Sequence, residues 1–99
     1  MTRFVVVRYT TTPQARDQNT QLVSEVYAAL AEAQPEGLRY ATLLLEDSTT
    51  FVHVAAQDGS DNALARLPAF QEFQRDLASR VLAAPDARSA TLIGSHHLF

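Results

Sequence analysis

The stretch "LRYATLLLEDSTTFVHVAA", residues 38–56, decides the fold, because it predicts two strands joined by a very short turn. The segments 38–46 and 49–56 are rich in β-branched and aromatic side chains, which favour extended backbone. Between them, Asp47 and Ser48 have the composition of a two-residue hairpin connection. We therefore expect an antiparallel pair of strands in the middle of the chain.

The same turn predicts the neighbours of His53. Counting back from the turn places Thr42 opposite His53 and Tyr40 opposite Ala55. Because side chains alternate across a strand, Tyr40, Thr42, Phe51 and His53 form one polar and aromatic patch. A histidine among valines is costly to bury without partners, so we expect a hydrogen bond from Thr42 or Tyr40. A satisfied core histidine and a catalytic base both remain open, and one residue can be both.

Outward from this hairpin, the sequence predicts one helix and one strand on each side. Upstream, "RFVVVRY" at 3–9 is a strand, and apolar residues spaced three and four apart predict a helix over 14–33. Downstream, a second helical pattern begins its main part at Pro68, with 63–67 as a lead-in turn. The final segment, 89–99, is predicted to be the last strand.

The resulting order, β-α-β-β-α-β, predicts an α+β ferredoxin-like sandwich with a four-stranded antiparallel sheet. Residues 1–99 form one such domain, since this is a common size for a single core. Both helices would cover one face of the sheet. Both faces are largely apolar, however, and an uncovered apolar face marks an interface. We expect a homodimer formed by sheet-on-sheet packing, forming a dimeric α/β barrel; which face His53 occupies stays open.

The composition excludes several classes of protein. The net charge is −3 and the eight basic residues are all scattered arginines, so a nucleic-acid surface is not expected. No apolar run approaches the length of about 20 residues that crosses a membrane. There is no cysteine, hence no disulfide and no cysteine-bound metal. The first residues also make a poor signal peptide, and we expect a cytoplasmic protein without nucleic-acid or membrane partners.

The chain resembles a known family in "FVHVAAQDGSDNALARLPAFQEFQRDL" at 51–77, in the terminal "GSHHLF" and in the order of its elements. It is similar to the dimeric α/β-barrel superfamily, and most of all to small proteins related to antibiotic biosynthesis monooxygenases. The resemblance implies a homodimer with a pocket between sheet and helices in each subunit. Some members oxidise polycyclic aromatic substrates with O2 and no cofactor, others degrade haem, and many have no known activity.

Two departures from this superfamily bear on activity. Monooxygenase-like members often carry a glutamate late in the third strand and a histidine at the start of the second helix. Those places hold Ala55 and residues near 64–67, with no acid or histidine. Haem-degrading members use an asparagine, a tryptophan and a histidine, and the absence of tryptophan disfavours haem degradation.

The candidate site combines the hairpin patch with aromatic residues of the second helix. In an enzyme, His53 would take a proton from an acidic substrate hydroxyl, and Tyr40 would orient the resulting anion. The expected ligand-binding residues are Arg39, Thr42, Phe51, Phe70 and Phe73. No cofactor is expected. Asn19, near the start of the first helix, is expected to be a surface residue.

The alternative is a non-catalytic dimer that binds a small hydrophobic or aromatic ligand, or that acts in stress or regulation. The missing acid and histidine favour it. An open cavity at Tyr40, Thr42 and His53 would favour the enzyme, and a patch that is packed shut would favour the alternative.

His96 and His97 raise the question of a metal site. In a regular strand their rings would point to opposite faces and could not readily chelate one ion. A zinc site also needs three or four converging ligands. We therefore expect no metal site, and assign both residues to a strand end exposed to solvent or lying at an interface.

Overall fold

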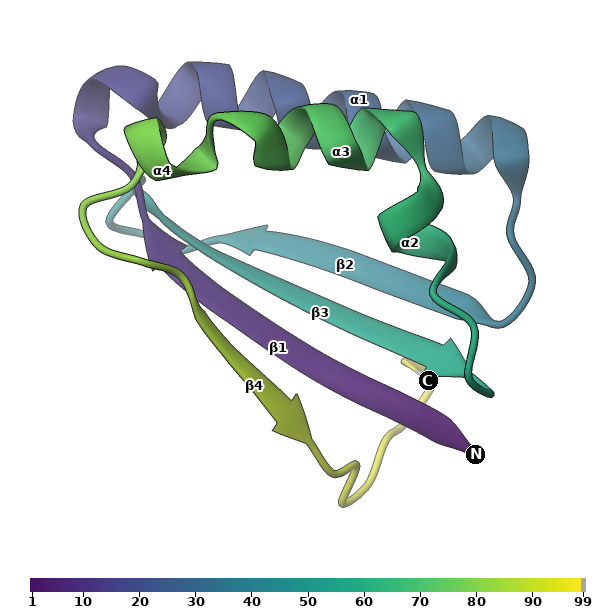
Figure 1. Ribbon diagram of the computed structural model, residues 1–99. Helices are drawn as coiled ribbons and strands as arrows, with labels where there is room; N and C mark the ends of the chain where they lie inside the picture. The colour runs from purple at the N-terminus through teal and green to yellow at the C-terminus, as the bar shows by residue number, and fades with distance from the viewer. Residues whose placement is uncertain (99) are drawn as a thin grey trace.

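The computed structural model describes residues 1–98 and forms two layers, a four-stranded antiparallel sheet and a layer of helices on one of its faces (Figure 1). This confirms the predicted ferredoxin-like α+β architecture. The elements are β1 (Thr2–Thr10), the 3-10 helix η1 (Pro13–Ala15), α1 (Arg16–Ala33), β2 (Leu38–Leu44), β3 (Thr50–Asp58), α2 (Ala63–Arg66), α3 (Pro68–Arg75), α4 (Leu77–Arg80) and β4 (Asp86–Ala90).

The strands lie in the order β2-β3-β1-β4, which places β1 and β3 in the centre of the sheet. In the β2–β3 hairpin, Thr42 lies opposite His53 and Tyr40 opposite Ala55, so the predicted register is confirmed. On the other side of β3, Val7 of β1 lies opposite His53. The histidine therefore occupies the middle of the sheet, with a strand on each side.

The hairpin turn is held by one aspartate. Oδ1 of Asp47 accepts hydrogen bonds from the backbone N–H of Thr49 at 2.9 Å and of Thr50 at 2.8 Å. Ser48, next to it, adopts the left-handed conformation with φ of 65°. Because β2 ends at Leu44, the connection is longer than the two residues predicted, although the strand register is the same.

Proline residues and capping side chains set the helix starts. Oγ1 of Thr12 accepts a hydrogen bond from the N–H of Ala15 at 3.2 Å, and Pro13 opens η1. Downstream, α2 is the predicted lead-in turn and Pro68 opens α3. The helical path then breaks at Asp76, so the predicted second helix is three short helices.

The predicted last strand over 89–99 is wrong in its position. β4 ends at Ala90, and 91–98 leave the sheet. Ala90 lies opposite Phe4, and β1 begins at Thr2, so the chain has almost no partner strand left beyond this point. Figure 1 shows the segment after β4 curling away from the strand below the sheet.

His96 and His97 consequently do not alternate across a strand. His97 has a left-handed φ of 61°, and the two ring centroids lie 4.2 Å apart in an edge-to-face arrangement. Both residues are exposed. The expectation that their rings point to opposite faces of a sheet is therefore wrong, while their exposure to solvent is confirmed. Phe99 lies outside the described residues.

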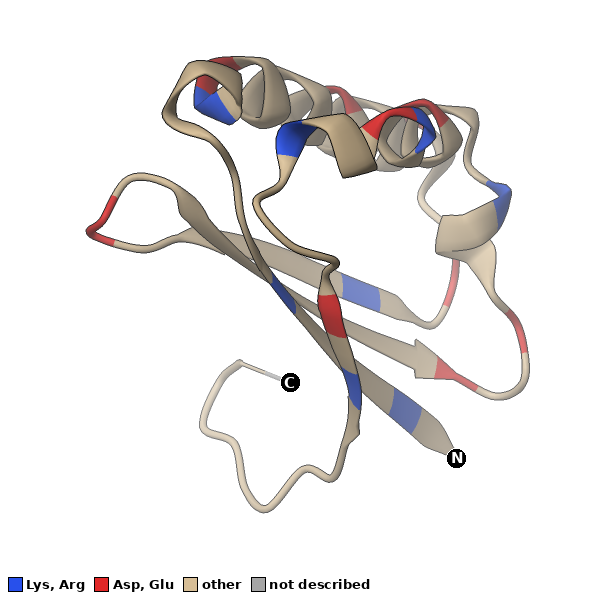
Figure 2. Cartoon of the chain, turned by 60° about the vertical axis from the view of Figure 1, so that its left-hand side comes forward, with Lys and Arg blue, Asp and Glu red and all other residues tan. Residues whose placement is uncertain are grey.

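The two faces of the sheet have different surroundings. Tyr9 and Phe51 point to the helices and belong to the buried core, together with Val23 and Val26 of α1. Leu43 alternates with them on the outer face and is 56% exposed. Figure 2 shows acidic and basic residues interspersed over helices, strands and loops. Within residues 1–98, no helix is both long and apolar enough to cross a membrane.

Candidate functional site

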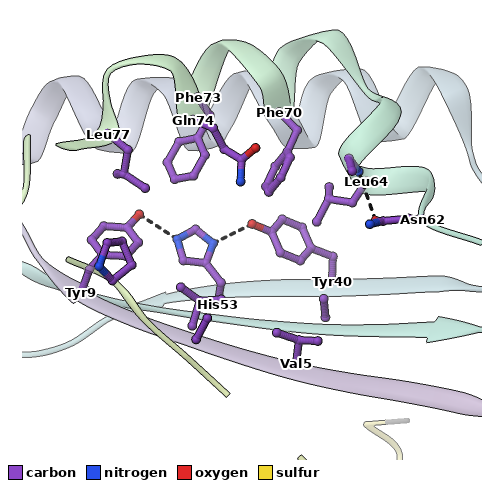
Figure 3. A pocket seen from close by; sticks show the side chains of 15 residues that line it. Val5, Tyr9, Tyr40, His53, Asn62, Leu64, Phe70, Phe73, Gln74 and Leu77 are labelled. Carbon is purple, nitrogen blue, oxygen red and sulfur yellow. Dashed lines mark hydrogen bonds between the residues drawn. The ribbon is translucent and has the colours of Figure 1, made fainter. Parts of the chain in front are cut away.

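A cavity of about 400 Å³ lies between the sheet and the helices α2 and α3 (Figure 3). This volume falls within the range of small-molecule sites, roughly 300–1,000 Å³. No lining residue carries a charged side chain. The polar and aromatic lining residues include Tyr9, Tyr40, His53, Asn62, Phe70 and Phe73. The cavity is therefore suited to an uncharged or weakly polar ligand with aromatic character.

His53 lies at the floor of this cavity, and both of its ring nitrogens have partners (Figure 3). Nε2 lies 2.7 Å from the hydroxyl of Tyr9. Nδ1 lies 2.6 Å from the hydroxyl of Tyr40 and 3.1 Å from Oγ1 of Thr42. Three adjacent strands thus bring these side chains together, and the predicted patch of Tyr40, Thr42 and His53 is assembled on the helix-facing side of the sheet.

The hydrogen bonds continue beyond His53 in both directions. Nδ2 of Asn19 donates to the Tyr9 hydroxyl at 2.9 Å, and Nε of Arg80 donates to Oδ1 of Asn19 at 3.0 Å. On the other side, the hydroxyl of Tyr27 lies 2.8 Å from Oγ1 of Thr42. We call this set the buried chain; its members are Arg80, Asn19, Tyr9, His53, Tyr40, Thr42 and Tyr27.

Every polar atom of this set that is fully enclosed has a hydrogen-bond partner. The same holds for all fully enclosed side-chain nitrogens and oxygens of residues 1–98. Full pairing is the normal condition for buried polar groups, since an unpaired one costs about 1–3 kcal/mol. The buried chain is therefore compatible with a structural role in a stable core as well as with a catalytic role.

Burial sets the protonation states at the site. His53 is only 5% exposed, and desolvation lowers the pKa of its imidazole to about 4. Desolvation also raises the pKa of Tyr9 to about 12, and it raises the pKa of Tyr40 well above its ordinary value. At neutral pH the site therefore contains a neutral imidazole, with one N–H, between two protonated phenols.

Phe70 and Phe73 of α3 form the aromatic wall opposite the sheet. Phe70 meets Tyr40 edge to face, with ring centroids 6.4 Å apart and an angle of 85°. Phe73 lies 5.5 Å from the His53 ring. Edge-to-face and tilted packing are the favoured arrangements for aromatic rings. Both residues line the cavity, so the structure brings them together with the hairpin patch as expected.

Three other expected ligand-binding residues do not line the cavity. Thr42 contacts Nδ1 of His53 but is not a lining residue. Phe51 is 2% exposed and stacks behind Tyr9 at 5.5 Å, and it does not line the cavity. Arg39 pairs with Ala56 one position from Tyr40, so it projects from the opposite face of the sheet and is exposed. The structure does not bring Arg39 together with His53.

Sequence reasoning missed several polar residues around the site. Asn19 was expected on the surface, but it is fully buried, and that expectation is wrong. It stands four and seven residues before Val23 and Val26, on the same buried stripe of α1, and this spacing was the available signal. Asn62 and Arg80 gave no comparable signal, because they approach the site through tertiary packing.

No metal centre is indicated around this site. Within the part of the chain that the structure describes, residues 1–98, no three histidine, aspartate or glutamate side chains gather closely enough to hold a metal ion. His96 and His97 contact each other without a third ligand.

Comparisons with known proteins identify the fold. The chain is similar to the Mycobacterium tuberculosis protein Rv0793, with a TM-score of 0.78 and 13% identity over 96% of this chain and 98% of that one. It is also similar to a Nitrosomonas europaea protein provisionally named an antibiotic biosynthesis monooxygenase, with a TM-score of 0.76 and 12% identity over 93% and 90% of the two chains.

A third similar structure is a single-residue variant of SnoaB, a cofactor-independent oxygenase from Streptomyces nogalater. Its TM-score is 0.71, with 17% identity over 95% of each chain. No family model matches the sequence, and no curated protein matches it. The resemblance to the monooxygenase-like proteins is thus confirmed at the level of fold, and at such identities it extends no further.

Proposed function

We propose that this protein is a cofactor-independent, monooxygenase-like enzyme acting on a small aromatic or polyketide-like substrate. The observation that carries the proposal is the imidazole of His53, held between two tyrosine hydroxyls at the floor of an uncharged, aromatic cavity of about 400 Å³. The description of SnoaB as a cofactor-independent oxygenase supports it by analogy of fold.

In this proposal the substrate proton reaches His53 through a tyrosine. Both imidazole nitrogens are occupied, so a ligand in the cavity meets the hydroxyl of Tyr9 or Tyr40 first. A substrate hydroxyl would pass its proton to a phenol oxygen while the phenol passes its own proton to the imidazole. The second tyrosine hydroxyl then donates a hydrogen bond to the substrate oxyanion. A relay through a hydroxyl fits general base catalysis at hydrogen-bond distances.

The oxidation needs no external reductant. Once deprotonated, an aromatic substrate is an electron-rich phenolate or carbanion that can reduce O2. A ring carbon that carries hydrogen and a ring carbon that carries the hydroxyl both become carbonyl carbons. One oxygen atom of O2 enters the product as the new carbonyl oxygen. The other leaves as water with the hydrogens lost from the C–H and O–H bonds. The substrate therefore supplies all the electrons.

We propose further that the protein acts as a homodimer through the outer face of its sheet. Leu43 is 56% exposed there, and Val6, Val52 and Val54 share that face by strand alternation. An exposed apolar sheet face of this kind is typical of an interface. A second copy with the same face satisfies it with twofold symmetry.

A non-catalytic ligand-binding dimer is the second candidate. It is favoured by the low pKa of His53, about 4, which makes its imidazole a weak base at neutral pH. It is favoured also by the absence of an acid or a histidine at Ala55 and near 64–67, the places where the resemblance to monooxygenase-like proteins leads us to expect them. Such a protein would bind the same aromatic ligands without consuming O2.

O2 uptake with a panel of hydroxylated polycyclic aromatic compounds separates the two candidates. We expect turnover by the wild type, its loss in His53→Ala, and its retention in His96→Ala, a matched histidine outside the cavity. Oxygen-18 from O2 should enter the product. Equal turnover by wild type and His53→Ala would refute the proposed role of His53. Binding without O2 uptake across the panel would favour the ligand-binding protein.

A further inference from the structure

Arg80 lies at one end of the buried chain, and it fixes which atom donates in each of the neighbouring hydrogen bonds. Arg80 is 2% exposed, and its guanidinium donates to Oδ1 of Asn19 at 3.0 Å and to the carbonyl oxygen of Phe73 at 2.6 Å. The Cζ atom of the guanidinium also lies 5.4 Å from the centre of the Phe73 ring. These contacts come from two other helices, α1 and α3, so the guanidinium is fixed in place by the fold.

The guanidinium fixes the orientation of the Asn19 amide. A guanidinium has donors only, so the atom of Asn19 that faces it must be the carbonyl oxygen. The amide nitrogen then faces Tyr9, 2.9 Å from its hydroxyl oxygen. Asn19 is fully buried, so no solvent competes for either end of the amide. The hydroxyl oxygen of Tyr9 therefore accepts a hydrogen bond from Asn19.

The hydrogen bond from Asn19 to Tyr9 in turn determines which nitrogen of His53 is protonated. The hydroxyl oxygen of Tyr9 already accepts from Asn19, and the hydroxyl proton needs an acceptor. Within residues 1–98 the only other polar group in contact with this hydroxyl is Nε2 of His53, at 2.7 Å. A proton on Nε2 would place two donors on the Tyr9 oxygen and leave the phenol proton unpaired in a buried place, which is costly. Nε2 must therefore be the acceptor.

We infer that Arg80, acting through Asn19 and Tyr9, holds His53 in the tautomer with its proton on Nδ1. Arg80, Asn19 and Tyr9 are positioning residues in this scheme. Nδ1–H then donates to the hydroxyl oxygen of Tyr40, 2.6 Å away. The proton of Tyr40 is left for Thr42 or for an acceptor in the cavity. When that proton faces the cavity, Tyr40 is a hydroxyl donor there, and an oxyanion or carbonyl oxygen is the ligand group that it would bind.

The test is the protonation state of each imidazole nitrogen of His53, read from nitrogen-15 chemical shifts in the resting protein. We expect Nδ1 protonated and Nε2 unprotonated in the wild type. A proton on Nε2 would overturn the inference. This result does not depend on the proposed function, because it needs no substrate, and the O2-uptake experiment decides turnover separately.

Asn19→Asp should invert the tautomer. A carboxylate of the same shape only accepts, so the Tyr9 proton turns toward position 19 and the Tyr9 oxygen accepts from Nε2–H. We expect Nε2 to gain the proton and Nδ1 to lose it. A protein in which Nδ1 stays protonated, with or without a second proton on Nε2, would contradict the relay. In Tyr9→Phe/Asn19→Asp the inversion should be lost, because the connecting hydroxyl is gone.

Substitutions at Arg80 give a second, independent test. Arg80→Gln places a side chain there that can donate or accept, so the Asn19 amide can turn over and both tautomers of His53 should be populated. Arg80→Lys retains a donor-only end and should restore the proton on Nδ1. Arg75→Gln removes an exposed arginine of the neighbouring helix as a matched control and should leave the tautomer unchanged. A structural role alone would not separate Arg80→Lys from Arg80→Gln in this measurement.

Discussion

The two faces of the sheet come from the same strands, yet they use different interactions. On the helix-facing side, Tyr40 and His53 are held by hydrogen bonds of 2.6 to 3.1 Å. On the outer side, Leu43 and Val54 have apolar side chains alone. Hydrogen bonds are directional and fix one arrangement, whereas apolar contact depends on area. The inner face thus has a defined geometry, whereas the outer face is an apolar surface without directional contacts of this kind.

The largest effect should come from removing inner-face volume. Phe51→Ala empties a position that is 2% exposed, beside Tyr9, and should lower the free energy of unfolding by about 3–5 kcal/mol. Val52→Ala, one position along on the outer face, should cost about 1 kcal/mol in the dissociated chain. Urea unfolding at low protein concentration measures both. Equal losses would contradict the difference between the faces.

The second prediction concerns the loss of folding stability at acidic pH. The pKa of His53 is lowered to about 4 in the folded protein, against about 6.5 in the unfolded chain. Between these values the unfolded chain binds the extra proton, so stability falls as the pH drops from about 6.5 to about 4. The loss from this one group should be about 3 kcal/mol, at 1.36 kcal/mol for each pH unit. Above pH 6.5 it should contribute no slope.

A matched pair of histidine variants isolates this effect. His53→Gln should flatten the fall between pH 6.5 and 4, whatever it costs in stability at neutral pH. His96→Gln, in the exposed segment after β4, should keep the wild-type fall. The measurement is urea unfolding at a series of pH values. If His53→Gln loses stability toward acid as steeply as the wild type, another buried group is responsible.

The hairpin could be predicted from sequence because its information is local. The position of the turn fixes which residues of the two strands lie opposite each other, and the alternation of side chains fixes the face to which each points. The pairing of Thr42 with His53 follows from both. The contact of Tyr9 with His53 depends on β1 lying beside β3, which the order of elements implied only in general. The first three strands and the contact of Tyr40 and Thr42 with His53 were predictable, whereas the position of the last strand and the contact of Tyr9 with His53 were not.

The missed features are those set by long-range packing or by a missing partner. Arg80 reaches Asn19 across 61 residues of sequence, and no local pattern signals such a contact. The segment after Ala90 has strand-like composition, but β1 offers it almost no further backbone to pair with. Propensity for extended structure is a weak guide where no neighbouring strand exists.

A charge on the outer face should change association more than folding. Leu43→Lys places an ammonium on the face proposed to meet a second copy, and it should raise the dimer dissociation constant at least tenfold, or about 1.4 kcal/mol. Because Leu43 is 56% exposed in the single chain, the monomer should lose no more than about 0.5 kcal/mol. Leu82→Lys, 66% exposed between α4 and β4, is the control and should leave association unchanged. Light scattering after size-exclusion chromatography measures the mass, and a wild type that stays monomeric at micromolar concentration would refute the dimer.

The smallest effect should come from the far end of the inner-face hydrogen bonds. Tyr27→Phe removes only the hydroxyl that lies 2.8 Å from Oγ1 of Thr42. Thr42 keeps its contact with Nδ1 of His53, so the loss should be that of one ordinary hydrogen bond, about 1 kcal/mol in urea unfolding. Tyr40→Phe removes the hydroxyl that accepts from Nδ1 and should cost more. If Tyr27→Phe lowers the free energy of unfolding as much as Tyr40→Phe does, the hydrogen bonds of the inner face act as one cooperative unit. The inner face would then differ from the outer face more than the individual hydrogen bonds imply.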